Sequence, residues 1–115
     1  MYRFSYAEVL DETPQSARAR ERMALDHSVA LLTAASQKGV DSQEAIEALH
    51  FCHRLWALLI EDLAHPENQL PPQLRADLIS IGLWVMKEAE AIRQGRSQNF
   101  QGMIQVTRAI SEGLQ

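Results

Sequence analysis

The residues best suited to metal chemistry stand close together, at His50, Cys52 and His53. Imidazole nitrogens and a thiolate sulfur are the ligands that zinc prefers in proteins. The spacing argues against a site, because residues two apart on a helix point in different directions and Cys52 is the only cysteine. We therefore expect no metal and no cofactor, and we interpret Cys52 as a small apolar residue of the core.

Positive charge gathers at Arg18, Arg20 and Arg22, a pattern that RNA-binding surfaces share. Glu21 interrupts this cluster, and 11 Lys and Arg against 15 Asp and Glu give the chain a net charge of -4. Affinity for phosphates comes chiefly from lysine and arginine, so a mildly acidic chain is a poor match for them. We expect a solvated helix face here and no direct binding of nucleic acid.

Patterns typical of catalysis are missing from the sequence. It contains no glycine-rich phosphate loop, no nucleophile elbow and no metal-binding box. We therefore expect a protein that acts by binding another protein and is not an enzyme.

Two tryptophans are candidates for such binding, because tryptophan is enriched at the energetic centres of interfaces. Trp56 falls on the apolar stripe of its expected helix, which favours burial in the core. Trp84 lies one residue beside its own stripe at Val85 and is the better interface candidate.

Arg54, Arg75 and Arg108 each border an apolar stripe. A guanidinium in that position can clamp the carboxylates or backbone carbonyls of a bound helix. The competing interpretation, which we favour, is an ion pair or a helix-loop clamp within the chain, such as Arg75 with the loop at Asn68.

Helices must position these side chains, because apolar residues recur at spacings of three and four along most of the chain. Helix ends are predicted by Gly39, by the capping-box residues Asp41 and Glu44, and by Pro66. The expected helices cover residues 14–38, 41–65, 71–94 and 97–113. Short connections favour antiparallel neighbours, so the sequence predicts an all-α antiparallel bundle of about four helices with a short N-terminal arm before residue 11.

Length and composition fit a single domain over residues 1–115, with 46% hydrophobic residues and a modest core. The sequence shows no signal peptide, and its longest apolar run, Leu55 to Ile60, is too short to cross a bilayer. A lone cysteine suits a reducing compartment. We therefore expect a cytoplasmic protein without a membrane partner.

Three segments of the chain carry a family pattern: His53-Arg54-Leu55-Trp56, then Asn68 to Ala76 with Ile79 to Val85, and last Thr107-Arg108-Ala109-Ile110 with Gly113-Leu114. Together they resemble the bacterial flagellar biosynthesis regulator FlaF family over nearly the whole chain. Two positions depart from the family pattern, which usually has asparagine where this chain has His53 and Thr107. Histidine and threonine can still form hydrogen bonds there.

The resemblance implies a role in flagellum assembly, in which such proteins promote the production or export of flagellin and work with FlbT, a regulator of flagellin mRNA. Apolar positions exceed one stripe on the second and third expected helices, so we predict a groove for an amphipathic helix of flagellin. The predicted protein-binding residues are Arg54, Leu58, Leu83, Trp84, Arg108 and Leu114.

Two other interpretations stay open. The chain could be a regulatory partner of FlbT that controls translation of flagellin mRNA without binding flagellin. It could also form a homo-oligomer through apolar residues such as Leu55 and Leu58.

Overall fold

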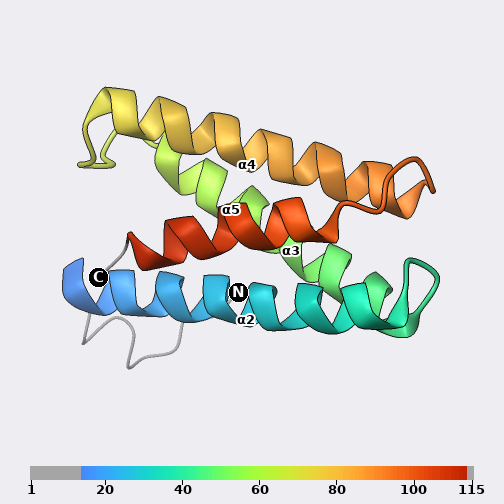
Figure 1. Ribbon diagram of the computed structural model, residues 1–115. Helices are drawn as coiled ribbons and strands as arrows, with labels where there is room; N and C mark the ends of the chain where they lie inside the picture. Colours follow the sequence, from blue (N-terminus) through green and yellow to red (C-terminus); the bar gives the residue numbers. More distant parts are fainter. Residues whose placement is uncertain (1–13, 114–115) are drawn as a thin grey trace.

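The computed structural model describes residues 14–113, and this part of the chain is entirely helical apart from its connections. Its helices are α2 (Pro14–Lys38), α3 (Gln43–Ala64), α4 (Pro72–Arg93) and α5 (Phe100–Glu112). Successive helices run in opposite directions (Figure 1). The predicted all-α antiparallel bundle is therefore confirmed. The expected N-terminal arm and Leu114 lie outside the described residues.

Two glycines end helices as the sequence predicts. Gly39 follows α2 with a φ of 102°, and Gly95 follows α4 with a φ of 80°. Side chains with a Cβ rarely adopt this left-handed backbone, so glycine is the residue that lets the chain leave the helix there.

The start of α3 differs from the prediction. The N-cap is Ser42, whose Oγ accepts a hydrogen bond from the backbone N–H of Ala45 at 3.0 Å. The predicted capping box of Asp41 with Glu44 is therefore wrong by one residue. A serine hydroxyl satisfies the same unpaired backbone N–H that the aspartate would have satisfied.

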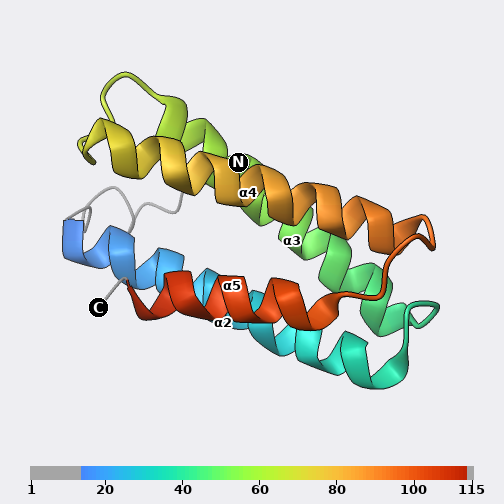
Figure 2. The same cartoon turned by 45° about the horizontal axis from the view of Figure 1, so that its top comes forward.

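The helices form two layers, one of α3 with α4 and one of α2 with α5. Extensive contacts join α3 to α4, α2 to α5, and α2 to α3, whereas α4 and α5 share no contact of that extent. Figure 2 shows α4 and α5 diverging from the loop that joins them. One long side of the bundle is therefore left partly open. Within residues 14–113, no helix has both the length and the apolar character that a membrane span requires.

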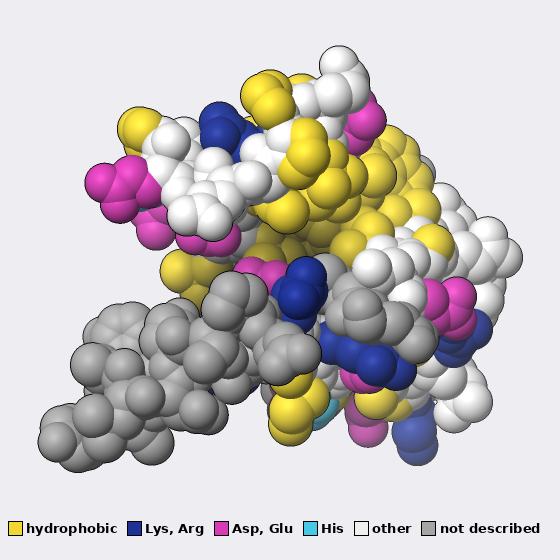
Figure 3. Space-filling view, turned by 90° about the vertical axis from the view of Figure 1, so that its left-hand side faces the viewer, with side chains coloured by type: hydrophobic (Ala, Val, Ile, Leu, Met, Phe, Trp, Pro, Cys, Tyr) yellow, Lys and Arg dark blue, Asp and Glu magenta, His cyan; other side chains and the backbone are white. Residues whose placement is uncertain are grey.

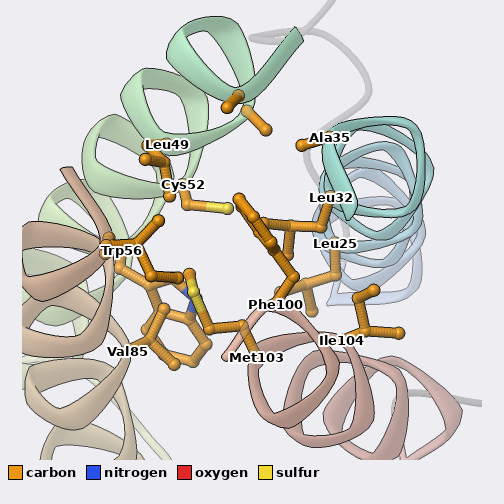
Figure 4. Packing of buried hydrophobic residues seen from close by; sticks show 14 residues of the cluster. Leu25, Leu32, Ala35, Leu49, Cys52, Trp56, Val85, Phe100, Met103 and Ile104 are labelled. Carbon is orange, nitrogen blue, oxygen red and sulfur yellow. The ribbon is translucent and has the colours of Figure 1, made fainter. Parts of the chain in front are cut away.

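The core lies between the layers, where Phe100 and Met103 of α5 face Cys52 and Trp56 of α3 (Figure 4). Trp56 is 1% exposed, as its position on the stripe predicts. Cys52 is also buried, and burial raises the pKa of its thiol to about 12. Both residues thus have the core positions that the sequence predicts.

Gly82 allows the closest approach between α3 and α4. A Cβ built on Gly82 would lie 2.5 Å from Cε3 of Trp56 and 3.1 Å from Cδ1 of Ile60. The indole ring therefore rests against the bare backbone of α4. This explains a glycine inside a helix, where it costs about 1 kcal/mol relative to alanine.

We predict that Gly82→Ala lowers the free energy of unfolding by about 1–2 kcal/mol, because overpacking outweighs the gain in helix propensity. Urea unfolding followed by circular dichroism measures the change. Gly113→Ala is the matched control, since a Cβ there would come no closer than 3.4 Å to another heavy atom. A Gly82→Ala protein as stable as the wild type would contradict this packing.

Candidate protein-binding cleft

The open side of the bundle lies between α4 and α5, which diverge from their shared loop (Figure 2). α4 has 22 residues and α5 has 13. α5 packs against α2, and at 1.5 Å per residue it is about 13 Å shorter than α4. The first turns of α4 therefore lack a helix beside them on that side.

An apolar cleft occupies this place. Its floor consists of core side chains from α2 and α3, namely Leu25, Trp56, Leu59 and Leu63. Its walls include Leu70 and Leu78 on one side and Ile110 on the other. Viewed toward the end of the bundle where α2 and α4 begin, Figure 3 shows a hollow lined by hydrophobic side chains. We call this hollow the α4–α5 cleft.

Large apolar side chains stay exposed along the α4 side of the cleft. Leu70, which lines the cleft, is 40% exposed, and Leu74, which lies one helical turn before the cleft residue Leu78 on the same face, is 42% exposed. Trp84 is 39% exposed further along α4, about 120° around the helix from Leu78. Exposed apolar side chains grouped along one cleft are typical of a binding surface.

The polar residues of the cleft are acidic. Glu21 of α2 and Asp62 of α3 both line it, together with the apolar side chains of its floor and walls. Carboxylates at the edge of an apolar cleft favour ligands with an apolar face and a basic margin.

The loop between α3 and α4 is fixed by Asn68. Its Nδ2 donates to the backbone carbonyl of Asp62 at 3.0 Å, and its Oδ1 accepts from the backbone N–H of Leu70 at 3.0 Å. Arg75 donates from Nη1 to the backbone carbonyl of Asn68 at 3.1 Å. The predicted clamp between Arg75 and this loop is confirmed, and it holds Leu70 at the cleft wall.

The structure does not bring the six predicted binding residues onto one surface. Leu83 is 51% exposed but lies roughly 160° around α4 from the buried Val85, so it faces away from the cleft. Trp84 is exposed about 120° around α4 from the cleft residue Leu78, and Leu114 lies outside the described residues. The role of the six residues in binding stays a prediction, although the structure places those that it describes on more than one surface.

Arg54 and Leu58 belong to a different surface. They line a shallow furrow between α2 and α3, which also contains His27, Glu47 and His50. Arg108 is exposed on α5, one residue after the buried Thr107, and does not line the cleft. The furrow joins two helices that are already packed together, whereas the α4–α5 cleft opens onto the core.

The two positions that depart from the family pattern, His53 and Thr107, differ in solvent exposure. His53 is exposed and lines a hollow beside Glu90 and Arg93 of α4, whereas Thr107 is fully buried on α5. Among residues 14–113, no hydrogen bond joins His53 to Thr107, and the hydroxyl of Thr107 has no hydrogen-bond partner. A direct contact between these positions is thus not present in the described part of the chain.

The apolar stripe of the third expected helix contains Leu74 and Leu78, but a stripe alone does not show which of its members a neighbouring helix covers. The predicted binding residues therefore did not include them. How far α5 diverges from α4 depends on packing between helices, which local spacing does not specify.

We predict that Asn68→Ala lowers the free energy of unfolding by about 1–2 kcal/mol, because it removes side-chain hydrogen bonds that hold the loop. Urea unfolding measures the loss. Gln69→Ala next to it removes an exposed side chain and should change stability by less than about 0.5 kcal/mol. Equal effects of the two substitutions would show that Asn68 does not hold the loop.

Comparison with known proteins identifies the family of this chain. Among curated proteins and solved structures, none matches the chain. The family model described as flagellar protein FlaF matches residues 2–114. This match covers all four described helices, the loop at Asn68 and the cleft. The chain therefore belongs to the FlaF family of flagellar proteins.

Proposed function

We propose that this protein is a flagellar regulator that binds flagellin through the α4–α5 cleft and promotes its synthesis or export. Membership of the FlaF family supports the flagellar role. The observation that carries the binding proposal is the apolar cleft, whose floor is the core of the bundle itself. The protein acts as a chaperone-like binding protein in the cytoplasm and not as an enzyme.

The shape of the cleft suits an amphipathic helix. α4 and α5 form two sides of a trough whose floor is supplied by α2 and α3, so a guest helix would take the place of a missing neighbour beside α4. Its apolar stripe would cover the exposed Leu70 and Leu74 together with the half-buried Leu78.

Covering these side chains would benefit both molecules. Burial of apolar surface contributes about 25 cal/mol per Å², so leucines that are already held in place give binding energy with little loss of conformational freedom. An export substrate bound in this way would keep its own apolar stripe away from other chains. Shielding of that stripe is the chaperone-like action that we propose.

We predict that Leu74→Glu weakens flagellin binding at least about tenfold, because it places a charge where an apolar contact is needed. Co-expression with flagellin followed by size-exclusion chromatography detects the complex, and titration calorimetry measures its affinity. Leu83→Glu is the matched control, since it places the same charge on an exposed leucine of the same helix that faces away from the cleft. Leu83→Glu should bind flagellin as the wild type does.

Three other outcomes of these experiments would contradict flagellin binding at the α4–α5 cleft. Flagellin that elutes free when both proteins are at micromolar concentration would contradict the proposal. If a pull-down recovers FlbT but never flagellin, the protein is instead a regulatory partner of FlbT. If Leu83→Glu weakens binding as much as Leu74→Glu, flagellin binds a different surface.

A further inference from the structure

We propose that residues 2–10 of this chain bind in the α4–α5 cleft of the unbound protein and must leave before a partner helix enters. Only the competition with flagellin rests on the proposed function, because the contact within the chain can be tested without any partner. The cleft would then have an internal ligand that covers its apolar walls until flagellin displaces it.

The position of Pro14 places this segment within reach. α2 begins at Pro14, at the end of the bundle where α3 ends and α4 begins (Figure 1). Glu21 of the cleft lies two turns further along α2, about 10 Å from Pro14 along the helix axis. An extended chain of the length that precedes Pro14 spans up to about 43 Å, so residues 2–10 can reach the whole cleft.

The composition of the segment suits an apolar cleft. Both tyrosines of the chain and one of its three phenylalanines occur here, as Tyr2, Phe4 and Tyr6. In an extended segment these three side chains face one side, and in a helix Tyr2, Tyr6 and Leu10 do so. Either backbone form therefore presents one apolar face to the exposed leucines of α4.

Dimensions and charge agree with the same placement. Tyr2 to Tyr6 would span about 13 Å when extended, which is about two turns of α4 and therefore enough to lie along both Leu74 and Leu78. Arg3 is the one basic residue among residues 1–13, and Glu21 and Asp62 supply carboxylates to the cleft. The charge of Arg3 therefore complements the acidic residues at the edge.

The intramolecular contact is tested with a spin label on the otherwise intact chain. Ser5→Cys carries a nitroxide, while Cys52 stays unlabelled because it is buried and its thiol pKa is raised to about 12. We expect the nitroxide to remove most of the NMR signal of the methyl groups of Leu74 and of Leu78, which lines the cleft. The methyl groups of Ile46 and Leu58, which lie on other surfaces of the bundle, should keep their signal.

A labelled chain that also carries Tyr2→Ser, Phe4→Ser and Tyr6→Ser is the control variant. It keeps the full length of the chain, and we expect it to restore the signals of Leu74 and Leu78. Uniform weak broadening in the original labelled chain, or broadening that survives the three substitutions, would overturn the proposal. Broadening of an isotope-labelled chain by a separate nitroxide-labelled chain would also overturn it, because the segment would then be binding a second copy.

Flagellin affinity tests the consequence separately. If residues 2–10 fill the cleft nine-tenths of the time, the triple-serine variant should bind flagellin about tenfold more tightly than the wild type. Broadening at the cleft without any flagellin binding would keep this inference and refute the proposed function. If both chains bind flagellin equally strongly and the cleft signals are not broadened, the proposed function stands and this inference is refuted.

Discussion

The contact of the Trp56 indole with the bare backbone of Gly82 is the constraint on which the rest of the structure depends. It brings α3 and α4 together along their length and at the same time places the indole in the floor of the cleft. A side chain at Gly82 would push α4 outward, because a Cβ there would lie 2.5 Å from the ring. Interiors of proteins are close-packed, so the displacement would extend to the neighbouring turns of α4. The shape of the proposed binding site is therefore set by one residue pair in the core.

The cleft itself exists because the bundle has three extensive helix contacts and lacks a fourth between α4 and α5. α5 packs against α2 and diverges from α4, so the first turns of α4 have α3 as their neighbour and none on the side of α5. The loop at Asn68 and Arg75 then holds Leu70 beside these uncovered turns. An exposed apolar cleft lowers solubility unless something covers it, so the arrangement is consistent with the binding role that we propose.

Much of the fold could be predicted from the sequence, because local signals specify it. Helices end at Gly39 and Gly95 and α4 begins at the prolines, as expected. Apolar residues at spacings of three and four identified Trp56 and Cys52 as core residues. The binding surface was harder to predict. Trp84 stands beside its stripe and is 39% exposed, but its position in the sequence does not separate it from Leu83 on the opposite flank, and its role in binding stays a prediction. Which flank faces a cleft depends on how two helices far apart in the sequence lie relative to each other.

The most direct test of the central claim is amide hydrogen exchange of the whole protein with and without flagellin. The account predicts slower exchange in the first half of α4, in the loop at Asn68 and in the second half of α5, with little change around His27 and Arg54 on the furrow between α2 and α3. Slowing at that furrow alone, or no slowing anywhere in the presence of saturating flagellin, would contradict a binding site in the α4–α5 cleft.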